Sequence, residues 1–349
     1  MKLAIVTAYH PITNHGSFLQ AYSLSKVLRT MGNEVYFVRT VPNLKTSINN
    51  AVKLIPRRGF LHRFTKVFYA ESDLRKLHFV DVPEINGSFS CVIFGSDEIW
   101  NIKNRFFLKN VFWETGEGIV PRITYAMSVG HAELKDFTDH PECSSQIKRF
   151  SAILYRDKHS GELLKNFTDL KLQQTVDPTL LVSLNDLCVK CQLPSKPYLL
   201  VYTYGVDGSI IANLKHFAKK EGLEIVSACF YHMWADRNIE SSALSLAYLM
   251  KNAKYVFTTT FHGAIFALRT HSQCGILPLR DKVRDICYQL QSEDRILKNG
   301  FTQADLRKVL KTTFRDNEFE DNLKKKQEIS LITLSKTLQN LMKEDKLNP

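Results

Sequence analysis

The sequence predicts an α/β protein built from two domains that face each other across a cleft. Two short polar segments carry this prediction: residues 95–101 (GSDEIWN) and 258–263 (TTTFHG) each follow an apolar run typical of a buried strand. Open α/β sheets build their ligand sites at the carboxyl ends of such strands. The two segments lie far apart and each has its own strand–helix surroundings, so facing domains are the simplest arrangement that brings them together. We therefore expect an enzyme with its site in the cleft.

Size and composition agree with two ordinary globular domains. The chain has 349 residues, of which 44% are hydrophobic and 23% charged. No apolar stretch reaches the roughly 18–20 residues that cross a bilayer. The N-terminus runs directly into a strand–helix unit instead of a secretory signal. Seven scattered cysteines fit a reducing compartment, and Cys188 and Cys191 lack the two further ligands of a structural zinc site. We expect a cytoplasmic protein with no metal.

The net charge of +12 predicts attraction to anions. Phosphorylated small molecules and anionic lipid surfaces are the favoured partners. Nucleic acid is not expected, because the sequence has no zinc finger, no aromatic RNA-binding motif and no basic helix repeat.

The first domain is expected over residues 1–185. It opens with a strand at 2–7, a polar loop, a helix at 17–31 and a strand at 34–39, which is how a doubly wound fold begins. The further strands predicted for this domain lie at 91–94, 123–128, 152–154 and 174–176.

Residues 41–80 form an insertion in which basic and aromatic side chains alternate. One interpretation is one or two surface helices whose aromatic residues pack on the sheet while the basic residues are solvated. The other is a flap that meets a lipid headgroup or an anionic acceptor. On the second interpretation, neutralising Arg57, Arg58 and Arg63 should weaken binding to vesicles.

The second domain is expected over residues 198–316, after a linker at 181–197 that contains two prolines. The elements predicted for it are strands at 198–203, 223–228, 255–258 and 276–280 and helices at 208–220, 241–252 and 264–269. Residues 317–349 are expected to form a long amphipathic helix that packs back across the domains.

Residues 14–17 lie between the first strand and the first helix. Backbone N–H groups and small side chains at a helix start can bind an anion or a sugar, which makes Asn14, Gly16 and Ser17 candidate acceptor contacts. An ordinary turn capped by Ser17 explains them equally well.

The segment 95–101 carries a stronger signal. Gly95 permits a sharp turn, Ser96 offers a hydroxyl, and Asp97 offers a carboxylate that can bind sugar hydroxyls or act as a base. The alternative is that Asp97 caps the turn that directs Trp100 into the core.

Three cationic or titratable positions suggest an anion site. Arg156 follows a buried strand, and its forked guanidinium suits a carboxylate or phosphate; the alternative is a surface pair with Asp157. His262 stands at a helix start, where the positive potential favours the neutral imidazole and attracts an anion; the alternative is a core histidine. Downstream, either Arg280 or Arg284 can complete the site.

Together these segments resemble the polysaccharide pyruvyl transferase family. The matching pieces occur in the order of the family: 16–21 (GSFLQA), 95–101 (GSDEIWN), 125–130 (YAMSVG), 156–160 (RDKHS), 177–181 (DPTLL) and 261–263 (FHG). No single piece is specific, but six in sequence are. Members of the family often carry an arginine just before the histidine, where this chain has Thr260 and Phe261.

The resemblance implies a glycosyltransferase-B-like fold of two Rossmann-like domains, without metal or cofactor. It implies transfer of pyruvate from phosphoenolpyruvate, the co-substrate, onto two hydroxyls of a sugar to form a cyclic ketal. Acceptors in the family are typically glycan repeat units, often lipid-linked. The donor would be bound by Arg156, His262, Gly263 and Arg280, with His262 as the acid. Asp97 or Glu98 would deprotonate the incoming hydroxyl.

Two other functions remain as alternatives. The first is a glycosyltransferase of the same fold that uses a nucleotide sugar and grips the ribose with a carboxylate. Its candidates in the second domain, Glu224 and Glu240, are not expected at the carboxyl end of a strand, which disfavours it. The second is a non-catalytic glycan- or lipid-binding protein, which would not need so many polar groups at strand ends.

Overall fold

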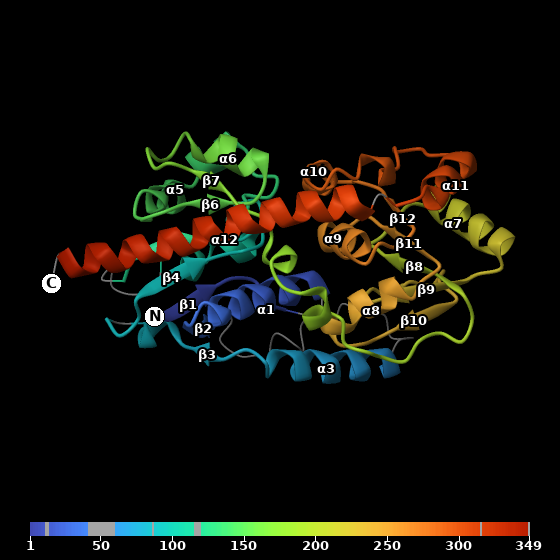
Figure 1. Ribbon diagram of the computed structural model, residues 1–349, viewed down its shortest axis with the longest axis horizontal. Helices are drawn as coiled ribbons and strands as arrows, with labels where there is room; N and C mark the ends of the chain where they lie inside the picture. Colours follow the sequence, from blue (N-terminus) through green and yellow to red (C-terminus); the bar gives the residue numbers. More distant parts are fainter. Residues whose placement is uncertain (11–13, 41–59, 86, 115–119, 315, 348–349) are drawn as a thin grey trace.

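The structure, a computed structural model, describes residues 1–10, 14–40, 60–85, 87–114, 120–314 and 316–347. Two five-stranded sheets form its framework, one in each half of the molecule (Figure 1). Their strand orders are β3-β2-β1-β4-β5 and β10-β9-β8-β11-β12, and all their paired strands are parallel. The order reverses beside β1 in one sheet and beside β8 in the other, and such switch points are where open α/β sheets bind ligands.

The first sheet contains β1 (Lys2–Val6), β2 (Glu34–Val38), β3 (Phe79–Val80), β4 (Cys91–Phe94) and β5 (Arg122–Thr124). All of β4 and most of β1 are buried, as expected of strands covered on both faces. The strand predicted at 123–128 is too long. Ala126 has a φ of 45°, which a continuing strand cannot accommodate.

The second sheet contains β8 (Tyr198–Tyr202), β9 (Glu224–Ala228), β10 (Arg237–Ile239), β11 (Tyr255–Thr258) and β12 (Cys274–Ile276). The strand predicted at 276–280 is wrong, because β12 ends at Ile276, the first residue of the predicted range. Pro278 has no N–H to donate to a neighbouring strand, and a turn closed by Leu279 N and Leu277 O (3.0 Å) follows.

A small third sheet pairs β6 (Leu154–Tyr155) with β7 (Gln173–Gln174). An isolated bridge between Met127 and Tyr155 connects it with the chain beyond β5. The carboxyl ends of β6 and β7 therefore lie near those of the first sheet.

The helices of the first half are α1 (His15–Thr30), α3 (Phe60–Leu74), α4 (Leu134–Thr138), α5 (Pro141–Ile147) and α6 (Lys158–Leu164). Those of the second half are α7 (Gly208–Glu221), α8 (Leu246–Lys251), α9 (Phe261–Arg269), α10 (Asp281–Gln289) and α11 (Gln303–Lys311). The helix predicted at 241–252 is shorter, since a 3-10 turn at Ala243–Ser245 precedes α8.

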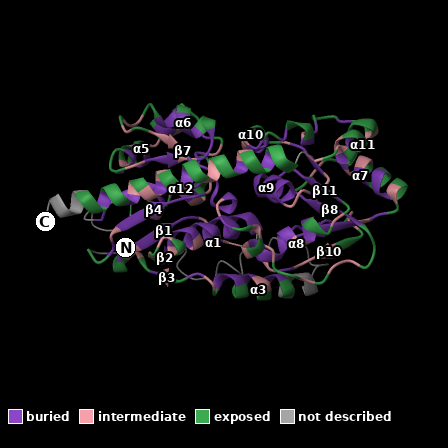
Figure 2. Ribbon diagram, viewed as in Figure 1, coloured by how far each residue is buried: buried purple, intermediate pink, exposed green. Residues whose placement is uncertain are grey.

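The last helix, α12 (Asp316–Leu347), runs across both halves of the molecule (Figure 1). Asn322 donates to Gln289 O in the second half (2.7 Å), and Ser330 accepts from Val176 N in the first (3.0 Å). Its buried and exposed residues alternate along its length (Figure 2). Two apolar residues of this helix, Ile329 and Ile332, are more than half exposed.

Helix α3 also links the halves, which corrects the first interpretation, in which its aromatic residues pack on the sheet and its basic residues are solvated. Lys66 is buried, where it donates to Cys229 O and lies 3.9 Å from Glu240 of the second half, whereas Phe68 is 69% exposed. Lys66 is therefore not solvated, and Phe68 does not pack on the sheet. Residues 41–59, with Arg57 and Arg58, and the side chain of Arg63 lie outside the description, so contact with a membrane stays a prediction.

No helix within the described ranges is long and apolar enough to cross a bilayer.

The link through α3 is testable at Asp73, which is buried and accepts hydrogen bonds from Ser242 Oγ (2.5 Å) and Ala243 N (2.7 Å). Asp73→Ala should lower the free energy of unfolding by roughly 1.5–3 kcal/mol, the range for hydrogen bonds to a charged group. The control is Glu71→Ala, an exposed acid on the same helix. Thermal denaturation measures both, and an equal effect of the two changes would contradict the link.

Candidate active site

A cleft of about 460 Å³ lies between the two halves, where the sequence predicts a site. On one side its lining residues come from the loops after β4, β5 and β6 and from the start of α6, and on the other from α10 and the loop before it: Glu98, Gly130, His131, Glu133, Asp157 and His159, then Leu279, Arg280, Asp281, Lys282 and Asp285. Charged side chains of both signs thus meet at the boundary between the halves.

A buried ion pair lies behind this cleft. Arg156 follows β6, Asp177 comes three residues after β7, and their side chains are 2% and 0% exposed. Arg156 Nη1 donates to Asp177 Oδ2 at 2.9 Å, while Thr179 N and Oγ1 bind Asp177 Oδ1. Burial alone would raise the pKa of Asp177, but His262 and Arg156 lower it further than burial raises it, so the carboxylate is ionised at neutral pH.

Arg156 is neither on the surface nor paired with Asp157, as the alternative interpretation had it. Asp157 instead caps α6 by accepting from Ser160 N (2.9 Å). Nε and Nη2 of Arg156 have no hydrogen-bond partner among the described residues, and its guanidinium carbon lies 4.3 Å from the centre of the Phe261 ring. Buried donors of a charged group are normally satisfied, so this guanidinium is arranged to receive a further acceptor.

His262 reaches the same carboxylate from the second half. Thr260 caps α9 by accepting from Gly263 N (3.0 Å), which places His262 in the first turn with its side chain 6% exposed. His262 Nε2 lies 3.6 Å from Asp177 Oδ2, too far for a hydrogen bond. No hydrogen-bond partner of this nitrogen is present in the described part of the chain.

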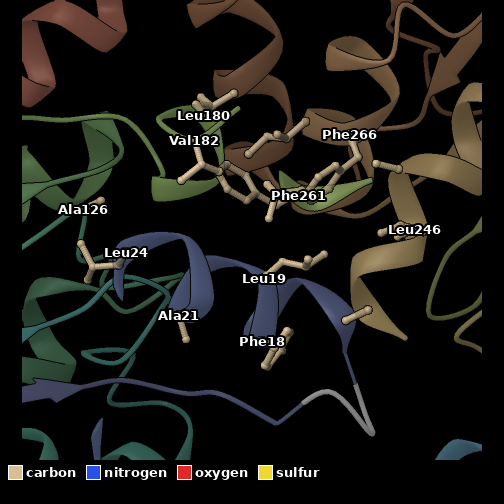
Figure 3. Packing of buried hydrophobic residues seen from close by; sticks show 14 of the residues in the cluster. Phe18, Leu19, Ala21, Leu24, Ala126, Leu180, Val182, Leu246, Phe261 and Phe266 are labelled. Atoms are coloured by element: carbon tan, nitrogen blue, oxygen red, sulfur yellow. The ribbon is translucent and has the colours of Figure 1, made fainter. Parts of the chain in front are cut away.

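The first turn of α1 closes on His262 from the other side. A Cβ atom on Gly16 would lie 2.1 Å from His262 Nδ1, so only glycine fits here. Asn14, not Ser17, caps α1, by accepting from Gly16 N (2.9 Å). The helices behind these residues pack together, with Phe18 and Leu19 of α1 and Phe261 and Phe266 of α9 in one hydrophobic cluster (Figure 3).

Glu98, Arg280 and Lys282 form the entrance of the site. Lys282 makes an ion pair with Glu98, and Arg280 Nη1 lies 3.9 Å from the same carboxylate. Burial would raise the pKa of Glu98, but Lys282 above all, then Arg156 and Arg280, bring it down to about 2. Arg284 is directed elsewhere: it lies 3.7 Å from Asp281 and lines a different cavity with Tyr288.

The other predicted residues have different surroundings. Ser96 is fully buried and donates to Gln20 Oε1 (2.6 Å), and Gln20 in turn donates to Ser17 O. Neither Ser96 nor Ser17 lines the cleft, so these contacts give no support to an acceptor role. Asp97 has a φ of 78° and accepts a hydrogen bond from Glu98 N (2.9 Å). Burial lowers the pKa of Arg156, but the neighbouring carboxylates raise it overall, with Asp177 contributing most and Asp97 next.

Sequence reasoning missed two members of the site. Asp177 was quoted as part of a motif without a role, although it follows a predicted strand by the same rule that selected Arg156. Lys282 lies between the two arginines that were considered. Its ion pair with Glu98 joins positions 184 residues apart in the sequence, which no local pattern reveals.

The fit of Gly16 against His262 gives a prediction with an unusual sign. Alanine is normally favoured over glycine within a helix by about 1 kcal/mol, but Gly16→Ala should instead destabilise the protein by about 1–3 kcal/mol, the cost of overpacking. The control is Gly208→Ala at the first position of α7, where nothing lies within 4 Å of the added carbon. Calorimetric unfolding compares them. A Gly16→Ala protein as stable as the parent would show that the contact is not close.

Solved structures similar to this chain share its fold. The spinosyn forosaminyltransferase SpnP is 14% identical with a TM-score of 0.50, and the match covers 99% of each chain. The UDP-GlcNAc 2-epimerase of Neisseria meningitidis is 12% identical with a TM-score of 0.53, over 97% of this chain and 100% of the other. The corresponding epimerase of Methanocaldococcus jannaschii is 9% identical with a TM-score of 0.52, over 96% and 100%. Such low identities show the fold alone: two Rossmann-like halves in a glycosyltransferase-B arrangement.

No curated protein matched the chain. A family model does, over residues 14–274, which is more than half of the 349 residues and includes the Arg156, Asp177 and His262 cluster. The match confirms the resemblance based on six short segments. The chain is a transferase that belongs to the polysaccharide pyruvyl transferase family.

Proposed function

We propose that this protein transfers pyruvate from phosphoenolpyruvate onto two hydroxyls of one sugar in a surface-polysaccharide precursor. The observation that carries this proposal is the buried guanidinium of Arg156, which has two unpartnered donor nitrogens and stands beside His262 at the junction of the halves. An arginine side chain can bind two oxygens of one carboxylate or phosphate group at once, and phosphoenolpyruvate carries both kinds of group. The reaction needs no metal and no cofactor.

The charges around the cleft support a small anionic donor. Arg280 and Lys282 face the same entrance as Glu98, so an incoming anion can replace part of their ion pairing with that carboxylate. Arg280 is a better candidate than Arg284, because Arg284 is turned toward another cavity. The N-terminus of α9 adds a positive dipole, although the N–H of Gly263 in its first turn already donates to Thr260.

The proposed chemistry balances without another reactant. A proton adds to the methylene carbon of phosphoenolpyruvate, and its central carbon forms two C–O bonds to the sugar while the C–O bond to phosphate breaks. Of the two hydroxyl protons, one replaces the proton delivered to the carbon and the other leaves with phosphate. His262 is positioned as the acid. Asp97 is the better candidate for the base, because the low pKa of Glu98, which Lys282, Arg156 and Arg280 maintain, makes Glu98 a weak proton acceptor.

A glycosyltransferase acting on a nucleotide sugar is the alternative, and one argument against it needs correction. Glu240 was placed before a helix, but it directly follows β10 and so lies at the carboxyl end of a strand. Its side chain is 3% exposed and lies 3.9 Å from Lys66 Nζ. A carboxylate that is buried beside Lys66 is poorly placed to bind the hydroxyls of a ribose. This burial of Glu240, together with the family match, favours phosphoenolpyruvate as the donor.

The acceptor we propose is a glycan repeat unit of capsule or exopolysaccharide, attached to a lipid. A protein of net charge +12 is attracted to an anionic membrane face. The reaction would then take place in the cytoplasm, with peripheral contact at the inner face of the plasma membrane.

Calorimetric titration with phosphoenolpyruvate, and separately with nucleotide sugars, tests the proposed donor. Phosphoenolpyruvate should bind, and His262→Ala and Arg280→Ala should each weaken it at least about tenfold, since a charge-assisted hydrogen bond contributes roughly 1.5–3 kcal/mol. Arg284→Ala, one helical turn further along α10, is the matched control and should leave the affinity within about twofold of the parent.

Binding of a nucleotide sugar without binding of phosphoenolpyruvate would contradict the proposal and favour the glycosyltransferase. Equal effects of Arg280→Ala and Arg284→Ala would show that the entrance at Glu98 is not the donor site.

A further inference from the structure

The cleft has an acidic side that the donor does not use. Glu98 and Glu133 are paired with lysines, at Lys282 and Lys103, and Asp281 with Arg284. Asp157 and Asp285 differ. Among the described residues, Asp157 Oδ2 has no hydrogen-bond partner and Asp285 makes no ion pair, yet both residues line the cleft.

Asp157 is the more informative of the two. Its residue is 4% exposed, and its Oδ1 is fully used by Ser160 N (2.9 Å) and Ser160 Oγ (2.7 Å). A buried carboxylate oxygen without a donor is costly. Because an ionised carboxylate only accepts hydrogen bonds, a ligand that relieves this cost must bring O–H or N–H donors.

Asp285 lines the same cleft as Asp157. Burial, then Asp157, then Asp281 raise the pKa of Asp285, while Lys158 and Arg284 act in the opposite direction. The two carboxylates come from opposite halves of the molecule, one before α6 and one on α10. A ligand with two neighbouring hydroxyls could therefore donate to both at once and relieve their mutual repulsion.

The remaining surface of the cleft suits a sugar ring. Leu279 is 52% exposed and lines the cleft, where it offers an apolar face to the C–H groups of a pyranose. A carboxylate or phosphate on that ring would instead meet Asp157 and Asp285, the two cleft carboxylates that are left without an ion-pair partner among the described residues. Like charges in a partly buried cleft repel strongly, so an anionic sugar is disfavoured.

We infer that this acidic side of the cleft is the acceptor subsite and that Asp157 and Asp285 bind hydroxyls of an uncharged sugar. The inference rests on the proposed function and narrows it, since it excludes uronic acids and sugar phosphates as the residue that receives the pyruvate. It also places the acceptor near the carboxyl ends of β5 and β6 rather than at the start of α1, where His262 packs against Gly16.

Saturation-transfer difference NMR tests the subsite with named probes. These are the methyl glycosides of glucose, galactose, mannose and N-acetylglucosamine, with methyl glucuronide as the anionic comparison, all in the presence of a chelator. At least one uncharged glycoside should bind, and methyl glucuronide should bind at least about tenfold more weakly. Asp157→Asn and Asp285→Asn should each reduce the affinity about tenfold, as expected for losing a charged acceptor.

Asp169→Asn, an exposed acid away from the cleft lining, is the matched control and should bind as the parent does. Circular dichroism checks the fold of each variant, and the partly exposed Asp285 keeps the test valid if Asp157→Asn does not fold. Absence of binding by every glycoside, stronger binding of the glucuronide, or no effect of Asp285→Asn would overturn the inference.

Phosphoenolpyruvate titration of the parent chain separates this test from that of the donor. A chain that binds phosphoenolpyruvate but fails the glycoside test contradicts only the acceptor subsite. A chain that passes the glycoside test without binding phosphoenolpyruvate contradicts the proposed donor and leaves the sugar subsite supported.

Discussion

The buried ion pair between Arg156 and Asp177 is the interaction on which the rest of the site depends. Taking two charges out of water is costly, and removing one partner of such a pair typically costs about 3–5 kcal/mol. The carboxylate holds one corner of the guanidinium and leaves Nε and Nη2 unpartnered. It also faces His262 from the second half. One aspartate therefore orients two groups that the two halves contribute separately.

The two halves are connected on several sides of this ion pair, so the cleft is present before any ligand binds. α1 and α9 share a hydrophobic cluster, and Gly16 packs against His262. On another side, α3 reaches the second half through Lys66 and Asp73. α12 crosses both halves (Figure 1). Preorganised groups need less reorganisation when charge develops during a reaction, which suits the reaction proposed for this cleft.

Local patterns were enough to predict the framework of this fold. Apolar runs such as 91–94 and 255–258 became β4 and β11, because strands buried on both faces are continuous in hydrophobicity. The same patterns placed Arg156 and His262 at strand ends. They could not reveal that Lys66 is buried in an interface, or that Ser96 is used by Gln20, since both facts depend on pairs of residues 163 and 76 positions apart. Strand ends were also misjudged where a single residue, such as Pro278 or Ala126, interrupts the pattern.

A double-mutant cycle on phosphoenolpyruvate affinity tests the central claim most directly. The dissociation constant would be measured by calorimetry for the parent, Arg156→Lys, Asp177→Asn and the double variant. If the carboxylate holds the guanidinium in position for the donor, each single change weakens binding and the double variant is no weaker than the worse single one, a coupling of at least about 1 kcal/mol. Additive effects, or singles that bind as the parent does, would show that the buried pair only stabilises the fold and that the donor binds elsewhere.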